Sequence, residues 1–225
     1  MNHYNQFTIR IWDLPTRIFH WTLAAAVIGL IVSANMGGNA MVWHFRLGYL
    51  VFTLLLFRIV WGFLGGHWSR WSQMPMAPRS VVAYLRGQSS ASQRAGHNPL
   101  GSWSVVALLS FLMLQVATGL FSDDEIANMG PFAHFVSGTW VSMSTFWHKQ
   151  VGKLVLIALI VLHILAIAWY SWRKRDALIQ AMWHGDKIFN ESLTPSKDER
   201  ATRLLALSCA ALILLSVAFV LSWSS

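Results

Sequence analysis

Four histidines lie within or at the edge of long apolar segments, where side chains that bind metals or protons are rare. They are His20, His44, His148 and His163, and the other five histidines of the 225-residue chain fall in loops or near segment ends. Coordinating or ionisable side chains within lipid cost free energy and usually have a function. Histidine costs least, because neutral imidazole carries no charge at pH 7. These four residues are therefore the first candidates for metal coordination or proton transfer.

The spacing of the four histidines sorts them into two pairs. His148 and His163 lie 15 residues apart in one apolar segment, which separates them by about 22 Å along a helix axis and by only about 60° around it. In the first apolar segment, His20 lies near the start, and 15 residues later the chain reaches Asn35 at the other end. A short loop follows, and His44 begins the next segment. We therefore expect His44 and His148 at one level of the membrane, and His20 and His163 at the other.

A repeated pattern indicates what the pairs bind. The sequence Trp-His-x-x-x-Gly occurs twice, ending at Gly48 and at Gly152. Each glycine lies one turn from its histidine on the same helix face, where a missing side chain leaves room for a flat group against the backbone. Zinc usually needs three or four protein ligands, whereas haem brings four nitrogens of its own. Two pairs of histidines therefore favour two bis-histidine haems, and the absence of a C-x-x-C-H motif makes them non-covalent haem b.

The elements that must hold these histidines are membrane-spanning helices. Only 12% of the residues are charged and 55% are hydrophobic, whereas soluble domains carry about 25% charged residues. Lipid leaves backbone polar groups unsatisfied in any open structure, and about 20 helical residues cross its hydrocarbon core. Five apolar segments have this length: Ile18–Asn35, Val42–Leu64, Ser102–Phe121, Phe146–Trp172 and Thr202–Trp223. The predicted fold is all-α, a four-helix transmembrane bundle that holds two haems, with a fifth C-terminal transmembrane helix.

The distribution of positive charge predicts the orientation in the membrane. The net charge is +8, but residues 36–41 and 122–145 contain no lysine or arginine. Basic segments stay in the cytoplasm, which places the N-terminus inside, His44 and His148 at the periplasmic face, and the C-terminus outside a bacterial inner membrane. The charge follows the membrane topology, so we expect no nucleic-acid partner. We expect residues 1–175 to form the haem domain, residues 176–200 a solvated cytoplasmic linker, and residues 201–225 the additional helix.

Cationic side chains near each level are candidates for binding haem propionates. Arg46, Lys149 and Lys153 lie near the outer level, and Arg58 and Arg17 near the inner level. A buried arginine such as Arg58 needs an anionic partner, and few carboxylates occur in these segments. A propionate meets that need. The three outer cations could equally be anchors at the membrane interface.

Four stretches of the chain resemble the bacterial cytochrome b561 family, which includes the b-type cytochrome subunits of nickel–iron hydrogenases. They read RIWDLPTRIFHW, WHFRLGYLVFTLLLFRIVWGFLG, GHNPLGSWSVVALL and WHKQVGKLVLIALIVLHILAIAW, and the resemblance covers residues from about 8 to 175. It implies two bis-histidine haems whose ligands fall on His20, His44, His148 and His163. It also implies electron transfer between the quinone pool and a partner. The fifth segment departs from the family's four helices, and its small residues suit packing against a partner subunit or a second copy.

We therefore predict a diheme b-type cytochrome that transfers electrons between quinone or quinol in the bilayer and a periplasmic redox protein. That partner would be a c-type cytochrome or a hydrogenase or dehydrogenase subunit. No catalytic residues are predicted, and whether the protein acts as an enzyme stays open. One alternative is a superoxide:quinone oxidoreductase, in which Arg46, Lys149 and Lys153 attract the anion. Another, of a different class, is a proton-coupled transporter that uses the histidines as relays and binds no haem.

Overall fold

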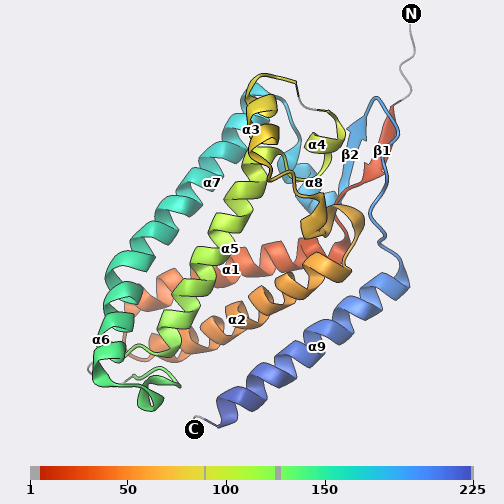
Figure 1. Cartoon of the computed structure of the whole chain (residues 1–225). Coiled ribbons are helices and arrows are strands. Elements are labelled where there is room, and N and C mark those ends of the chain that lie inside the picture. Colours follow the sequence, from red (N-terminus) through yellow and green to blue (C-terminus); the bar gives the residue numbers. More distant parts are fainter. Residues whose placement is uncertain (1–5, 89, 125–127, 224–225) are drawn as a thin grey trace, which may run out of the picture. The chain divides into compact units, whose positions relative to one another are not determined.

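Five long helices dominate the chain, as the sequence predicts. The computed structural model describes residues 6–88, 90–124 and 128–223. Within them, five helices are long and apolar enough to cross a membrane (Figure 1): Leu14–Met36 (α1), Ala40–Leu64 (α2), Pro99–Leu120 (α5), Gly138–Arg173 and Arg200–Ser222 (α9). The fourth of these is composite, and consists of α6 (Gly138–Phe146), a π-helical turn η4 (Trp147–Gly152) and α7 (Lys153–Arg173). The five predicted spans are confirmed.

Two helix starts differ from the prediction for physical reasons. The first helix begins at Leu14, four residues before the predicted Ile18. Asp13 acts as its N-cap, because its Oδ1 accepts a hydrogen bond from the Thr16 amide at 2.8 Å and so satisfies an amide that has no partner in the first helical turn. Residues 138–145, expected in an outer loop, form α6 and lengthen the fourth span.

Short elements occupy segments that were predicted as loops. A two-stranded antiparallel sheet joins β1 (Phe7–Arg10) to β2 (Asp186–Phe189), with Phe7 opposite Phe189 and Arg10 opposite Asp186. Apart from this short sheet the described residues are mostly helical, as predicted. The remaining short helices and helical turns are η1 (His67–Ser69), η2 (Trp71–Gln73), α3 (Pro78–Leu85), α4 (Ser92–Ala95), η3 (Ala133–Phe135) and α8 (Leu178–His184).

Residues 176–200, which were predicted as a solvated linker, contain folded elements although most of their side chains are at least partly exposed. They contain α8 and β2, and the side chains of Ala181 and Ser196 are buried. The Ser196 hydroxyl donates to the Ile11 carbonyl at 2.6 Å, and the Ser196 amide donates to the Arg10 carbonyl at 2.7 Å. These bonds attach the segment to the residues just before α1.

The chain forms two compact units. The first contains the described residues up to His20, together with Arg58–Val106 and Leu162–Ser208, and the second contains Trp21–Phe57, Ala107–Val161 and the described residues from Cys209 on. The first has a core of six buried side chains: Ile9, Ile11, Trp12, Trp68, Ala95 and Ala181. The second has a core drawn from α1, α2, α5 and α7: Ala26, Val27, Val51, Leu55, Leu112, Val116, Leu120 and Leu156. Each unit contains one of the two predicted histidine pairs.

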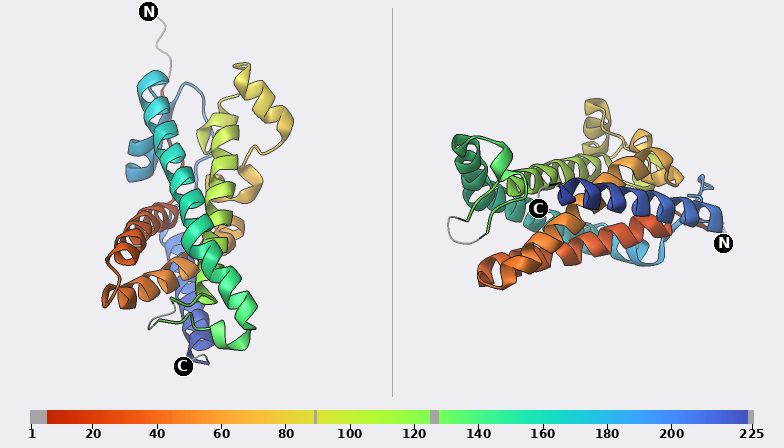
Figure 2. Two further views of the ribbon diagram at one scale, coloured as in Figure 1. Left: turned by 90° about the vertical axis from the view of Figure 1, so that its left-hand side faces the viewer. Right: turned by 90° about the horizontal axis from the view of Figure 1, so that it is seen from below.

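A tight turn joins α1 to α2 in the second unit (Figure 2). Gly37 and Gly38 have φ values of +64° and +53°, a left-handed conformation that glycine adopts without steric cost. The Gly37 amide bonds the Ser33 carbonyl at 3.1 Å, and the Ala40 amide bonds the Gly37 carbonyl at 3.1 Å. The short turn brings the beginning of α2, and with it His44, beside the end of α1.

Candidate functional site

His44 and His148 face each other within the second unit, as the sequence predicts. His44 lies in the second turn of α2, and His148 lies in the π-helical turn η4. Their ring centroids are 6.1 Å apart, and the ring planes stand at 87°. Two imidazole nitrogens on opposite sides of one metal ion, each about 2.0 Å from it, would place the ring centroids about 6 Å apart. The spacing therefore fits two histidines that would hold one haem iron between them.

Hydrogen bonds at the other ring nitrogen support the same role. The Nδ1 of His148 lies 2.8 Å from the Gln115 carbonyl, and the Nδ1 of His44 lies 3.1 Å from the Leu30 carbonyl and 3.3 Å from the Ser33 hydroxyl. A carbonyl oxygen only accepts, so Nδ1 must carry the proton, which leaves the lone pair of Nε2 for a metal. Metal-binding histidines commonly have this second hydrogen bond, which orients the ring and raises its basicity.

The two glycines of the repeated pattern have different surroundings. A Cβ added at Gly48 would meet nothing within 4 Å, so this position keeps the open space that a flat group needs. A Cβ at Gly152 would collide with Gln115 Oε1 and would lie 2.7 Å from Trp147 Nε1. The space beside Gly152 is therefore occupied by protein, and its lack of a side chain serves the packing of α5 against the π-helical turn.

The three outer cations lie on the surface of the second unit. Arg46, Lys149 and Lys153 are all exposed, and the Arg46 guanidinium lies 5.2 Å from the centre of the Trp43 ring. A cation over an exposed indole contributes about 0.5–1 kcal/mol. Their predicted role at the propionates stays a prediction.

The second histidine pair lies in the first unit. His20 and His163 are half-buried and close enough to interact electrostatically. His97 also interacts electrostatically with both of them and with Arg58. The predicted inner pair is thus brought together, and a third histidine joins it that the sequence analysis left without a role.

His97 and Asn98 explain the GHNPLG motif of residues 96–101. Asn98 caps α5, because its Oδ1 accepts a hydrogen bond from the Gly101 amide at 2.8 Å, and Pro99 is the first residue of that helix, a position that suits proline. The His97 ring packs against Trp12 with 4.7 Å between ring centroids. Its Nδ1 is buried and has no hydrogen-bond partner within the described part of the chain. Burial, reinforced by the nearby charge of Arg58, lowers the pKa of His97 to about 3, so the ring is neutral at pH 7.

Arg58 has an anionic neighbour in the protein that the sequence analysis missed. Its side chain is 3% exposed, its guanidinium lies 4.1 Å from the centre of the Trp71 ring, and the Asp13 carboxylate attracts it electrostatically. Among the described residues, Arg58 Nη1 has no hydrogen-bond partner. One buried donor therefore remains for an anion such as a propionate. The signal for Asp13 was the sequence Asp-Leu-Pro-Thr at the start of an apolar run, which is typical of a helix N-terminus.

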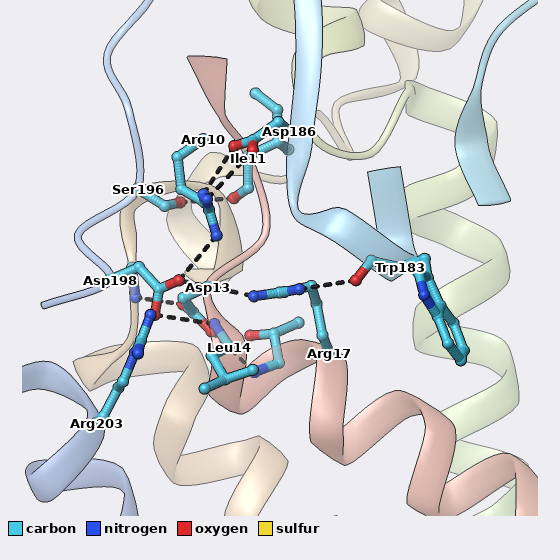
Figure 3. Close-up of polar contacts among 12 residues, drawn as sticks. Arg10, Ile11, Asp13, Leu14, Arg17, Trp183, Asp186, Ser196, Asp198 and Arg203 are labelled. Carbon is cyan, nitrogen blue, oxygen red and sulfur yellow. Dashed lines mark hydrogen bonds and ion pairs between the residues drawn. The ribbon is translucent and has the colours of Figure 1, made fainter. Parts of the chain in front are cut away.

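Arg17 is engaged within the protein (Figure 3). Its guanidinium donates to the Trp183 carbonyl at 2.7 Å and lies 3.8 Å from the Asp198 carboxylate. Asp198 also pairs with Arg10 and Arg203, each at 3.0 Å. Burial alone would raise the pKa of Asp198, but hydrogen bonds from Arg203 and the Leu14 amide, with the charges of Arg203 and Arg10, lower it. Arg17 is therefore part of an ion-pair cluster. To bind a propionate, as predicted, it would have to exchange these protein partners for the haem.

Comparison with known proteins identifies the family. The family model described as prokaryotic cytochrome b561 matches residues 11–185. The chain belongs to the prokaryotic cytochrome b561 family. Membership implies haem b and electron transfer in a membrane, and the five apolar helices agree with a multi-pass membrane protein.

Several relatives of this cytochrome carry names that refer to hydrogenases. It is 23% identical over 219 residues to the "Probable Ni/Fe-hydrogenase B-type cytochrome subunit" of Bradyrhizobium diazoefficiens, covering 82% of this chain and 87% of that protein. It is 26% identical to the protein of the same name from Cupriavidus necator, covering 80% and 87%. It is 24% identical to the "Probable Ni/Fe-hydrogenase 1 B-type cytochrome subunit" of Escherichia coli K12, covering 78% and 88%.

Proposed function

We propose that this cytochrome carries two haem b groups and transfers electrons across the bacterial inner membrane, between quinone or quinol and a periplasmic redox protein. One observation carries the proposal: the rings of His44 and His148 are 6.1 Å apart, and each Nδ1 faces a backbone carbonyl. His44 and His148 would bind the outer haem, and His20 and His163 the inner one. Family membership favours this function over a haem-free transporter.

The haems would supply the one-electron chemistry, and the protein would place and tune them. The carbonyls of Leu30 and Gln115 hold the outer imidazoles in one tautomer with Nε2 available. Near the inner pair, the buried Nη1 of Arg58 offers a charged donor to a propionate. Charge-assisted hydrogen bonds of this kind are about twice as strong as neutral ones.

The names of the relatives suggest the partner. Because several similar proteins are named as Ni/Fe-hydrogenase subunits, we take a hydrogenase subunit as the first candidate, with a c-type cytochrome or another dehydrogenase subunit as the alternatives. Exposed Arg46, Lys149 and Lys153 lie near the outer histidines in sequence and would steer an acidic docking surface toward them. The same cations would attract superoxide. Measuring whether the purified protein reduces quinone with superoxide therefore distinguishes a superoxide:quinone oxidoreductase from a cytochrome that exchanges electrons with a protein partner.

Counting haems in purified variants tests the proposal. The dithionite-reduced minus oxidised spectrum of the wild-type protein in detergent should show two low-spin haem b groups per chain. His148→Ala should remove the outer haem and His163→Ala the inner one, with one haem left in each variant. His134, an exposed residue outside both pairs, supplies the control, and His134→Ala should retain two. A folded wild-type protein without haem would overturn the ligand assignment, and loss of both haems in folded His148→Ala would count against independent sites.

A further inference from the structure

Two residues of α5, one helical turn apart, contact His148. Gln115 makes two hydrogen bonds with it: the Gln115 carbonyl accepts from His148 Nδ1 at 2.8 Å, and the Gln115 side-chain amide donates to the His148 carbonyl at 2.9 Å. The two bonds link the same pair of residues through both the ring and the backbone. The imidazole therefore cannot turn about its side-chain bonds without breaking the Nδ1 bond, and the backbone that carries it is held by the second bond.

Gly119 lies beside Cε1 of the same ring. A Cβ added at Gly119 would lie 2.8 Å from His148 Cε1, closer than real Cβ atoms approach other heavy atoms, and 3.1 Å from Nδ1, which is a tight contact. Gly119 is the penultimate residue of α5, and the packing of α5 beside the π-helical turn requires a residue without a Cβ at this position. That requirement is room for the His148 ring.

The local backbone of His148 also differs from that of His44. His148 lies in a π-helical turn, and such turns are rare and frequent at functional sites. The π-helical turn widens the helix at His148, and the Gln115 side-chain amide donates a hydrogen bond to the His148 carbonyl there. His44 lies in a regular α-helix, and its Nδ1 faces the Leu30 carbonyl and the Ser33 hydroxyl of α1.

We propose that Gln115 and Gly119 are positioning residues that fix the orientation of the His148 imidazole, and thereby the angle between the two ligand planes of the outer haem. The proposal rests on the proposed function. The Gln115 carbonyl holds the ring at Nδ1, the Gln115 side-chain amide holds the backbone at His148, and the missing side chain of Gly119 leaves room for the ring. The ring of His148 stands at 87° to that of His44, so any rotation brings the two planes closer to parallel.

The orientation has a spectroscopic signature that simple helix packing lacks. In a low-spin ferric haem with two imidazole ligands, the angle between their planes sets the splitting of the iron d orbitals and hence the spread of the g values. Perpendicular planes give the largest spread. Replacing a residue that only packs two helices together would change the thermal stability and leave the g values of the bound haem unchanged.

The test is electron paramagnetic resonance of purified Gly119→Ala, with the outer haem signal assigned by its absence in His148→Ala. The added methyl must displace the ring, so we expect a downward shift of the largest g value of the outer haem, or loss of that haem alone. Gly138→Ala is the matched control, because a Cβ at Gly138 meets nothing within 4 Å, and it should give the wild-type spectrum. Two bound haems with unchanged g values in Gly119→Ala would overturn the proposal.

A second variant decides the matter if Gly119→Ala does not fold. Gln115→Met removes the amide that binds the His148 carbonyl, keeps the backbone carbonyl that faces Nδ1, and adds no bulk at the ring. A smaller downward shift of the same g value supports the proposal, and an unchanged spectrum overturns it. Wild-type protein without haem would overturn the proposed function itself, whereas two wild-type haems with unresponsive g values would overturn only the positioning role.

Discussion

Replacing Asp13 with alanine should destabilise the unit that contains His20 and His163 by about 3–5 kcal/mol. Asp13 is fully buried. Its carboxylate accepts hydrogen bonds from the Thr16 amide at 2.8 Å, the Gly66 amide at 2.9 Å and the Trp61 indole at 3.2 Å. The cap on α1 contributes about 1 kcal/mol, the buried Gly66 amide costs about 1–3 kcal/mol once its acceptor is gone, and the bond from Trp61 contributes about 1 kcal/mol.

Thermal unfolding of the purified protein, followed by tryptophan fluorescence, measures this loss. For a chain of this size, 1 kcal/mol corresponds to about 2–4 °C in the unfolding midpoint, so the midpoint of Asp13→Ala should fall by about 10 °C. Asp176→Ala is the control, because Asp176 forms a partly exposed ion pair with Lys187 at 2.8 Å and such pairs contribute about 1 kcal/mol or less. If the midpoints of the two variants agree within 2–3 °C, the reasoning about the buried carboxylate is wrong.

Two further predictions concern other parts of the chain. Burial lowers the pKa of His97 to about 3, whereas a histidine of the unfolded chain titrates near pH 6.5. His97 should therefore lower the unfolding free energy by about 1.4 kcal/mol for each pH unit below 6.5, and between pH 5 and 6.5 the pH dependence of stability, followed through unfolding midpoints, should be shallower by that amount in His97→Asn than in the wild type. The last helix, α9, is predicted to dock a partner subunit or a second copy of the chain. Truncation after Ala206 removes most of α9 but keeps the Asp198–Arg203 ion pair, and it should weaken that association on native gels. Unchanged association would refute the docking role of α9.

The spanning helices and both histidine pairs could be predicted because their signals are local or strictly periodic. Apolar segments of about 20 residues indicate the helices, and the 15-residue spacing of His148 and His163 indicates two levels. The structure brings His44 next to His148, and His20 near His163. Their ligand role stays a prediction until haem is measured.

The features that sequence reasoning missed depend on contacts between distant segments. The pairing of β1 with β2 joins residues about 180 positions apart, as at Phe7 and Phe189, and neither strand has a long alternating pattern of its own. The π-helical turn at His148 lies in a run that is helical on either side, so the apolar pattern is uninterrupted. The sequence analysis could not single out Gln115, because its importance follows only from the 2.8 Å contact between its carbonyl and His148 Nδ1, 33 residues away.

The attachment of residues 186–198 to the start of the chain has a consequence for biosynthesis. The Ser196 hydroxyl binds the Ile11 carbonyl across 185 residues, and Asp198 binds the Leu14 amide across 184. At about 5–20 residues per second, a ribosome needs roughly 10–40 s to make the missing partners. Late in that interval, after residue 148 is made, the nascent chain contains His44 and His148, while the strand that pairs with residues 7–10 does not yet exist. Chains arrested between residues 148 and 186 should therefore contain both His44 and His148 while the unit around His20 and His163 is still incomplete.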